Sequence, residues 1–378
     1  MVEVPAVDFA LSEEQQMLRE TTRQFLEDQV PPAVVRTVME SDSGFDDRLW
    51  KSAAGLGWHS LAIPEEYGGA GYGFVELSVV LEELGRALFP GPFLSTVVMA
   101  TTSILLGGSE GQKAELLAGV AAGEELLTMA LFEGPHAAGV EDIAMTARGV
   151  DGKWVLDGPK TNVLYGGVAR TIITAARTPG GLSLFLVPAD APGLTIEDKP
   201  TLDSTRRQAD LVFDGVLLGP DSILGEEGSA GPVVDRVLQL ASVALALEQV
   251  GGAQWCLDTS VRHARTRYQF GRAIGSFQAI KHRCADMLVA VEHSRSAAYH
   301  AARVTEETEE VRLAAPLAKS VCSEAYLRAA ADTIQILGGT GFTWEHEAHL
   351  YLKRAKSTSL MFGSVRQQRR LLAGVLGL

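Results

Sequence analysis

The first third of the chain carries apolar residues at the spacing of amphipathic helices. Residues 12–15 (SEEQ) have the form of a capping box, and Leu18 and Leu26 continue one apolar face behind it. A second helical pattern covers residues 74–88 and ends near a Pro-Gly-Pro stop. These patterns predict an N-terminal helical domain over residues 1–125.

Near residue 126 the helical spacing gives way to short apolar runs and alternation. The segment 144–160 alternates on either side of Asp151-Gly152, a dipeptide typical of a two-residue type I′ hairpin. Further short runs with strand character lie at 126–132, 171–177, 182–188 and 209–218. This series predicts an antiparallel β domain over residues 126–228, rather than strand–helix–strand units.

Helical periodicity returns at Pro232 and then persists. The pattern predicts three long helices and a shorter fourth, at 232–266, 277–306, 312–337 and 344–356. Long helices with short links indicate an antiparallel four-helix bundle, which we place at residues 229–378. The expected fold class is α+β, in the order helical domain, β domain, helical bundle.

Composition limits the partners that the chain can have. Of its 378 residues 46% are hydrophobic, and its formal net charge is −14. That charge argues against nucleic acid or an anionic membrane as the main partner, because both require a basic face. No apolar run reaches the roughly 18 residues of a membrane span, and the N-terminus does not resemble a signal peptide. We expect a soluble cytoplasmic protein.

Neither the cysteines nor the histidines suggest a metal site. Cys256, Cys284 and Cys322 lie in apolar helical patterns, and their odd number and their spacing fit neither a disulfide framework nor a zinc site. We expect them to be buried free thiols. The eight histidines include no His-Glu-x-x-His motif, and His346 and His349 are expected to bind surface groups rather than a metal.

Two glycine motifs are expected to be structural. Residues 107–111 (GGSEG) match Gly-x-Ser-x-Gly, but a nucleophile elbow joins a strand to a helix, whereas this segment lies between two helical patterns. The glycines of residues 68–73 follow no strand and do not fit a dinucleotide-binding fingerprint.

The segment 267–287 (RYQFGRAIGSFQAIKHRCADM) has features of an anion site. Arg267 ends one predicted helix and Gln278 opens the next, across a tight glycine-bracketed loop. A guanidinium beside the free amides of a helix N-terminus suits a pyrophosphate. An arginine bridging to a carboxylate of the same chain is the equally simple alternative.

The segment 335–356 (QILGGTGFTWEHEAHLYLKRAK) places two glycines after Gln335, at the end of a helix. Gly338 and Gly339 permit a left-handed cap and a close backbone approach. An ordinary cap needs only one glycine, so we expect a flat or bulky group to pass close by.

Together these two segments resemble the acyl-CoA dehydrogenase family. The resemblance rests on Arg-x-x-Phe-Gly…Phe-Gln…Lys-His…Ala-Asp-Met from Arg267 and on Gln-Ile-Leu-Gly-Gly-x-Gly-Phe from Gln335. Residues 56–73 and the helix–β–helix order match as well. The resemblance implies FAD as cofactor, oxidation of acyl-CoA thioesters to 2,3-enoyl-CoA, and electron-transfer flavoprotein as acceptor. It also implies that one subunit supplies the flavin wall and a glutamate base, while its neighbour's bundle holds the ADP half of FAD.

The resemblance carries a set of ADP-holding residues onto this chain. Arg267 and Gln269 match the family's pyrophosphate contacts, Phe270 packs beside them, and Gln278 follows. Gln335, Gly338 and Gly339 match the loop that lies along the neighbour's cofactor.

The catalytic half of the family pattern is altered. The base follows an Ala-Lys pair in the family, whereas Phe362 occupies that position here. In the minority of relatives with a base in the first bundle helix, the position corresponds to Ala241, beside Ser242. Glu248 is the nearest acid, about two helical turns away, or some 10 Å, and remains a weak candidate for a shifted base.

The flavin wall and the tail are unusual too. Asn162-Val163-Leu164 replaces the wall's Trp-x-Ser/Thr, and the preceding loop has become residues 131–136. After Glu347 there is no further acid. The tail instead carries Lys353, Arg354, Lys356, Arg366, Arg369 and Arg370.

We therefore expect a non-catalytic subunit of a heteromeric, α2β2 acyl-CoA dehydrogenase, with FAD and the base in a catalytic partner. The resemblance implies a bulky acyl-CoA, such as a steroid side chain. Three alternatives remain: a self-sufficient homotetramer with a relocated base, a base-free flavoprotein lyase, and a structural partner without cofactor contact.

Overall fold

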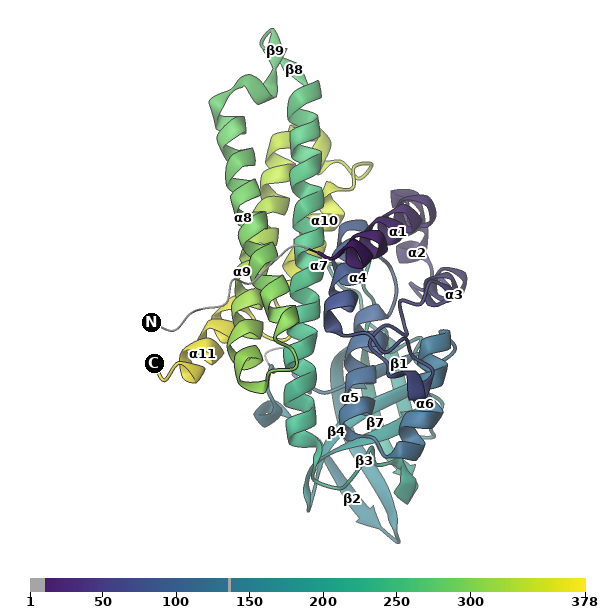
Figure 1. Cartoon of the computed structure of the whole chain (residues 1–378). Coiled ribbons are helices and arrows are strands. Elements are labelled where there is room, and N and C mark those ends of the chain that lie inside the picture. Colours follow the sequence, from purple (N-terminus) through teal and green to yellow (C-terminus); the bar gives the residue numbers. More distant parts are fainter. Residues whose placement is uncertain (1–10, 135–136) are drawn as a thin grey trace.

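The computed structural model describes residues 11–134 and 137–378. It shows a helical layer, a twisted sheet and a long helical bundle that runs along both (Figure 1). The predicted fold class is confirmed. The bundle extends well beyond the rest of the molecule, and its far end carries the β8–β9 hairpin.

The N-terminal layer begins with the predicted capping box, in which the Ser12 side chain accepts a hydrogen bond from the amide of Gln15. Ser109 caps a later helix in the same way, so residues 107–111 join two helices as predicted. One stretch, η2, is π-helical, which no pattern in the sequence indicated. The elements are α1 (Glu13–Gln29), α2 (Pro32–Glu40), α3 (Asp47–Gly55), η1 (Glu65–Tyr67), α4 (Phe74–Ala87), η2 (Phe93–Ala100), α5 (Thr101–Gly107) and α6 (Glu110–Ala122).

The sheet has the order β1-β4-β2-β3-β7-β6, with β5 paired to β4. Asp151 and Gly152 both have positive φ, as the type I′ hairpin requires. The prediction of an antiparallel domain was wrong for β4, because β4 pairs in parallel with both β1 and β2. The strands are β1 (Leu127–Ala130), β2 (Thr146–Val150), β3 (Lys153–Leu164), β4 (Thr171–Thr178), β5 (Gly181–Pro188), β6 (Leu194–Asp198) and β7 (Gln208–Leu218), with short helices η3 (Val140–Asp142) and η4 (Pro220–Ser222).

The bundle is built on α7, a helix of 37 residues whose middle is wholly buried. Its length and composition would allow it to cross a membrane, but 67% of its most apolar window is buried, as in a core helix. The helix α11 was not predicted. The elements are α7 (Ala230–Thr266), β8 (Tyr268–Gln269), β9 (Arg272–Ala273), η5 (Ile274–Ser276), α8 (Gln278–Arg303), α9 (Thr308–Leu337), η6 (Gly338–Phe342), α10 (Ala348–Thr358) and α11 (Val365–Val375).

Two glycines let α4 and α7 cross closely. A Cβ on Gly85 would lie 2.0 Å from the carbonyl oxygen of Glu248, and one on Gly251 would lie 1.8 Å from that of Glu82. Any side chain there would push the helices apart. This close crossing fixes the position of Glu248 inside the molecule.

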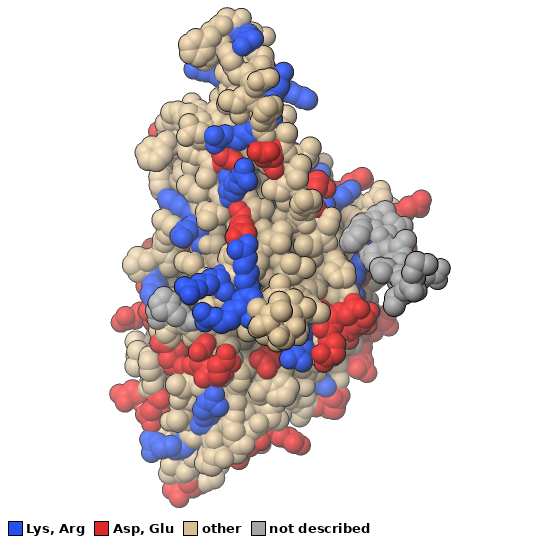
Figure 2. All heavy atoms as spheres, turned by 90° about the vertical axis from the view of Figure 1, so that its left-hand side faces the viewer, with Lys and Arg blue, Asp and Glu red and all other residues tan. Residues whose placement is uncertain are grey.

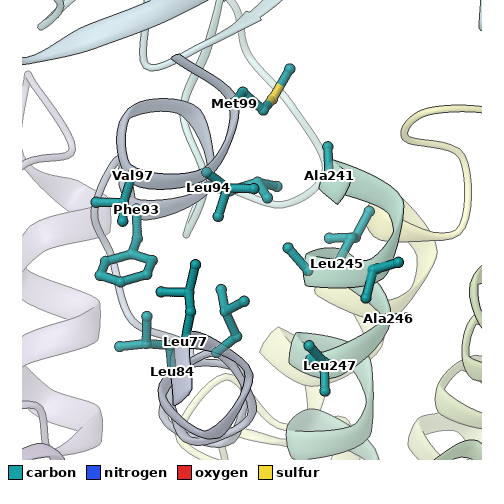
Figure 3. Packing of buried hydrophobic residues seen from close by; sticks show 14 of the residues in the cluster. Leu77, Leu84, Phe93, Leu94, Val97, Met99, Ala241, Leu245, Ala246 and Leu247 are labelled. Carbon is teal, nitrogen blue, oxygen red and sulfur yellow. The ribbon is translucent and has the colours of Figure 1, made fainter. Parts of the chain in front are cut away.

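One large apolar core fills the space between η2, α4 and α7 (Figure 3). Leu94 of η2 and Leu77 of α4 face Leu245 of α7 across this core. Of the three cysteines, Cys256 and Cys322 are buried as expected, whereas Cys284 is only half-buried.

Candidate functional site

The residues expected to hold a cofactor lie at the far end of the bundle. Arg267 follows directly after α7, and the next four residues form the tight β8–β9 turn, with Phe270 and Gly271 both at positive φ. Phe270 is 90% exposed, and a left-handed conformation is costly for an aromatic residue. The chain thus holds a strained aromatic side chain in solvent.

The N-terminus of α8, beside this turn, offers unused hydrogen-bond donors. Gln278 begins the helix, and no described side chain caps it. The hydroxyl of Ser276 is buried and has no hydrogen-bond partner among the described residues. The guanidinium of Arg272 lies 4.1 Å from the ring of Phe277, which holds it near the helix start. Free amides and an orphan hydroxyl at a helix N-terminus can bind an anion.

The charge at this end is strongly positive. Arg262, Arg265, Arg267 and Arg272 occur between Asp258 and Asp286 with no acid among them. Arg267 is exposed and forms no ion pair with any described residue, so the alternative of an internal bridge does not apply. Burial, together with Arg267 and His346, lowers the pKa of His263. The tip therefore fits a diphosphate.

The second predicted segment closes the same end of the bundle from the other side. A hollow of about 330 Å³ lies between Thr266, next to Arg267, and Leu337, next to Gly338. A Cβ on Gly338 or Gly339 would meet nothing within 4 Å, so no described residue passes close to them. The predicted left-handed cap was wrong: Gly338 has φ 63° and ψ −139°, a region open essentially to glycine alone.

All seven predicted cofactor residues are therefore exposed at one end of the molecule. They are Arg267, Gln269, Phe270, Gln278, Gln335, Gly338 and Gly339. They surround open space rather than a closed cleft, and no part of the sheet covers them (Figure 1). A ligand bound here alone would remain largely in solvent.

The positions expected for a catalytic base lie elsewhere, in a closed junction. We use this name for the buried contact of the loop before β7 (residues 203–207), α7 near Glu248, and the loop 359–364. Phe362 is half-buried at φ 55°, and its carbonyl accepts a hydrogen bond from Gln368 at 2.5 Å. Ala241 is fully buried and Ser242 nearly so. None of these three residues carries a base.

Glu248, the weak candidate, is ion-paired. Its carboxylate binds the guanidinium of Arg206, and both side chains are at most 7% exposed. The same guanidinium lies 3.9 Å from the sulfur of Met361, next to Phe362. Arg206 thus stands between Glu248 and the loop where the family's usual base lies.

A second buried ion pair completes the closed junction. Arg354 of α10 binds Asp203 at 2.7 Å and donates to the carbonyl and hydroxyl of Thr205. Tyr165, at the end of β3, donates to the same carbonyl, and burial raises its pKa to about 12. The two arginines and the two acids balance in charge, and all four side chains are at most 7% exposed.

The altered flavin wall also satisfies its polar groups within the chain. The amide of Asn162 donates to Asp210, and its side-chain oxygen accepts from Lys199. The buried Lys160 pairs with Glu133, yet burial lowers the Lys160 pKa to about 8. Glu133 in turn accepts hydrogen bonds from two backbone amides. The predicted changes at Pro135 and His136 lie outside the described residues.

The remaining candidates have structural roles. Ser109 is a helix cap, His349 bonds to the carbonyl of Trp344, and His346 accepts a hydrogen bond from the amide of Ala348. Among the described parts of the chain, no group of three or more His, Cys, Asp or Glu could hold a metal ion. Sequence reasoning missed Arg206 and Asp203, because nothing in a linear pattern marks their partners.

Known proteins resemble this chain along nearly its whole length. The middle and N-terminal domains of acyl-CoA dehydrogenase match residues 128–216 and 12–124, and the C-terminal domain matches residues 231–377. The acyl-CoA dehydrogenase IpdE2 of Mycolicibacterium smegmatis is 32% identical over 363 residues, which cover 96% of this chain and 98% of IpdE2.

Two solved structures have the same fold and similar sequences. The ChsE4–ChsE5 complex of Mycobacterium tuberculosis matches with a TM-score of 0.90 and 29% identity, covering 98% of this chain and 99% of the matched one. The Tcur3481–Tcur3483 steroid ACAD, as its G363A variant, matches with a TM-score of 0.86 and 32% identity, covering 97% and 98%. The chain belongs to the acyl-CoA dehydrogenase family.

Proposed function

We propose that this chain is the non-catalytic subunit of a heteromeric acyl-CoA dehydrogenase. It holds the ADP half of FAD through its bundle tip, and a catalytic partner subunit supplies the flavin wall, the glutamate base and most of the acyl pocket. Bound FAD would accept the hydride that leaves the acyl β-carbon. The complex would contain two copies of each subunit and pass its electrons to electron-transfer flavoprotein.

One observation carries this proposal: Glu248, the candidate for a relocated base, is held by Arg206 in a buried ion pair. Its side chain is only 7% exposed and its carboxylate is occupied by the guanidinium, so it is not open to a substrate. Ala241 is fully buried, in the same apolar core as Leu94 and Met99 (Figure 3). A base contributes about 10²–10⁴-fold in rate, so a chain without one needs a partner that has it.

The bundle tip supports the other half of the proposal. Exposed Arg267, free helix amides and the orphan Ser276 hydroxyl fit a diphosphate, yet no described residue covers Arg267 or the start of α8. Such a half-site is useful only when another protein brings the rest of the cofactor. For the acyl group we propose a bulky acyl-CoA such as a steroid thioester, because a solved relative is named a steroid ACAD.

Turnover by the complex tests the assignment of the base. Glu248→Gln in this chain should leave kcat of the assembled complex within about twofold, whereas the same change at the partner's catalytic glutamate should lower it by about 10²–10⁴-fold. Loss of turnover with Glu248→Gln, in complexes with unchanged flavin content, would instead establish the relocated-base enzyme. Formation of product without an electron acceptor would identify the lyase.

A further inference from the structure

Two adjoining hollows lie between the N-terminal layer and the bundle, and we call them together the side cleft. Their volumes are about 280 Å³ and about 260 Å³, and the side chains of Arg23 and Arg86 line both. The larger hollow is bounded by α1, α2, α4, α7 and α10, which Figure 1 shows beside one another, and the smaller by α1, α4, α7 and α8. None of the lining residues belongs to the seven predicted cofactor residues or to the closed junction.

The larger hollow has mainly apolar walls. Trp255 stacks on Tyr351 with ring centroids 3.7 Å apart, and the Tyr351 hydroxyl is already occupied, because it donates to the carbonyl of Arg86 at 2.6 Å. Leu88 adds to the wall although it ends α4 at φ 53°, a conformation that favours glycine. Further apolar residues of the wall are Leu26, Val30, Val35, Ala87 and Leu350. Such a hollow suits the apolar body of a small molecule, which would leave water on entering.

The smaller hollow is lined by more cations than anions. Four arginines line it against two acids, and they are Arg19, Arg23, Arg86 and Arg295 against Glu82 and Asp258. Arg295 binds Glu82, Arg86 binds Asp258 at 2.7 Å, and Arg23 binds Glu83 of the larger hollow. Arg19 is half-buried and forms no ion pair with any described residue. One guanidinium of this hollow therefore lacks a partner.

The paired arginines between the two hollows keep unused hydrogen-bond donors. Arg23 uses Nε and Nη2 on Glu83, whereas Arg86 uses only Nη1, on Asp258. Nη1 of Arg23 and both Nε and Nη2 of Arg86 can therefore donate to a ligand.

The remaining acids near the cleft lie away from these donors or in solvent. Glu347 and Arg262 line the hollow at the bundle tip as well, so they mark the far end of the larger hollow. Glu27 and Glu292 are exposed, and water screens their charges.

Clustered cations elsewhere on the molecule lie in a different setting. Figure 2 shows the side of the molecule that faces left in Figure 1, where Lys and Arg gather across the middle of the surface, next to Asp and Glu. Charges on such a surface are hydrated and screened. The side cleft differs because its arginines adjoin an apolar hollow.

We propose that the side cleft binds an amphiphilic monoanion, with a carboxylate head at Arg19, Arg23 and Arg86 and an apolar body in the larger hollow. A carboxylate supplies the single negative charge that Arg19 lacks, and its two oxygens match the geometry of guanidinium N–H groups. An inorganic anion would leave the apolar hollow in contact with water, and a neutral apolar molecule would leave Arg19 unpaired. The site goes beyond the proposed function and does not rest on it.

Calorimetric titration of the full chain with octanoate tests the site. Octan-1-ol is the probe without the charge, and acetate is the probe without the apolar body. Octanoate should bind once per chain, at least about 10-fold more tightly than either. Arg19→Gln should lower the affinity for octanoate by about 10-fold or more and leave that for octan-1-ol unchanged. Ala87→Phe, which fills the larger hollow, should lower both affinities.

Arg48→Gln is the matched control, because Arg48 is an exposed arginine of α3 outside both hollows, and it should change neither affinity. Arg267→Ala, at the bundle tip, should also leave octanoate binding unchanged. A second readout uses the parent wall: 8-bromooctanoate should quench part of the tryptophan fluorescence, and Trp255→Phe should remove that part.

Absence of octanoate binding would overturn the site, as would octanoate affinity that is the same in the parent, Arg19→Gln and Ala87→Phe. Quenching that Trp255→Phe does not reduce would overturn it too, even if Ala87→Phe failed to fold. Failure of the proposed function appears separately, as flavin in the chain alone, and would leave the octanoate titration unchanged.

Discussion

The bundle tip and the closed junction differ in whether their polar groups have partners within the chain. At the tip, Arg267 forms no ion pair, the first amides of α8 and the Ser276 hydroxyl have no partner among the described residues, and Phe270 is held strained in solvent. At the junction, two arginines and two acids pair with each other, and all four side chains are at most 7% exposed. A lone chain gains nothing from unpaired groups at its surface, so the tip is built for a ligand that arrives with another molecule. The charged groups of the junction are already paired within the chain.

The largest expected effect comes from breaking the junction. Arg206→Met leaves the Glu248 carboxylate buried without a partner, which should cost about 3–5 kcal/mol of unfolding free energy. Arg206→Met/Glu248→Met removes both charges and should fall within about 2 kcal/mol of the parent chain. Urea unfolding measures both. Equal destabilisation by the two variants would contradict this account, because it would mean that the lone Glu248 carboxylate carries no burial penalty.

At the tip, the corresponding change should act on the ligand and leave the fold intact. Arg267→Ala removes a charge-assisted contact with the diphosphate, worth about 1.5–3 kcal/mol, or roughly 10–100-fold in FAD affinity of the complex. The unfolding free energy of the chain alone should not change measurably, because Arg267 is exposed and unpaired. Flavin titration of the stripped complex gives the affinity. Unchanged affinity would favour a structural partner without cofactor contact.

A buried lysine next to the junction predicts a pH dependence. Lys319 is fully buried, donates to the carbonyl of Thr358 at 2.9 Å, and has its pKa lowered by burial to about 7. Between pH 7 and its ordinary value of 10.5, the unfolded chain binds more protons at this site than the folded chain. The contribution of this group to the free energy of unfolding therefore rises with pH, by about 1.4 kcal/mol per pH unit.

Lys319→Met should remove that contribution. The unfolding free energy of the variant minus that of the parent should therefore decrease by this slope from pH 7 to 9.5, because only the parent gains stability from Lys319 as the pH rises. Denaturant titrations at several pH values measure it, and the subtraction cancels other titrating groups, such as Lys160. Parallel pH profiles of the two proteins would show that Lys319 keeps its charge at neutral pH when folded.

The smallest expected effect is at Phe270. Phe270→Gly relieves a left-handed aromatic residue but adds backbone entropy to the unfolded chain, so the stability of the chain alone should change by less than about 1 kcal/mol. The FAD affinity of the complex should nevertheless fall, because the ring is 90% exposed beyond its edge-on contact with Phe277 at 6.1 Å and would gain most of its contact area from the cofactor. A large stability change would mean that the ring supports the tip itself.

Long periodic elements could be predicted from the sequence, whereas the contacts that close the junction could not. The helices α7, α8 and α9 agree with their predicted ranges to within four residues, because their apolar stripes run for many turns. Several short elements were missed, among them β6 and α11. Strand β6 has no buried residue, and α11 has only Gln368. Without a buried stripe, neither leaves a clear pattern.

The candidate site divides in the same way. The tip residues were predicted from the family resemblance of two short segments, and the structure brings both segments to one end of the bundle. The pairing of Arg206 with Glu248 spans 42 positions, and that of Asp203 with Arg354 spans 151. Nothing local in the sequence selects such partners. They follow from how the β domain docks on α7 and α10, which only the three-dimensional arrangement provides.

The proposal that this chain holds only the ADP half of FAD is tested most directly by its flavin content. The chain should be expressed alone and together with its catalytic partner, and the absorbance of FAD compared with the protein mass of each purified species. We predict a colourless chain alone and two FAD per four-subunit complex. One tightly bound FAD per copy of the chain purified alone would contradict the account.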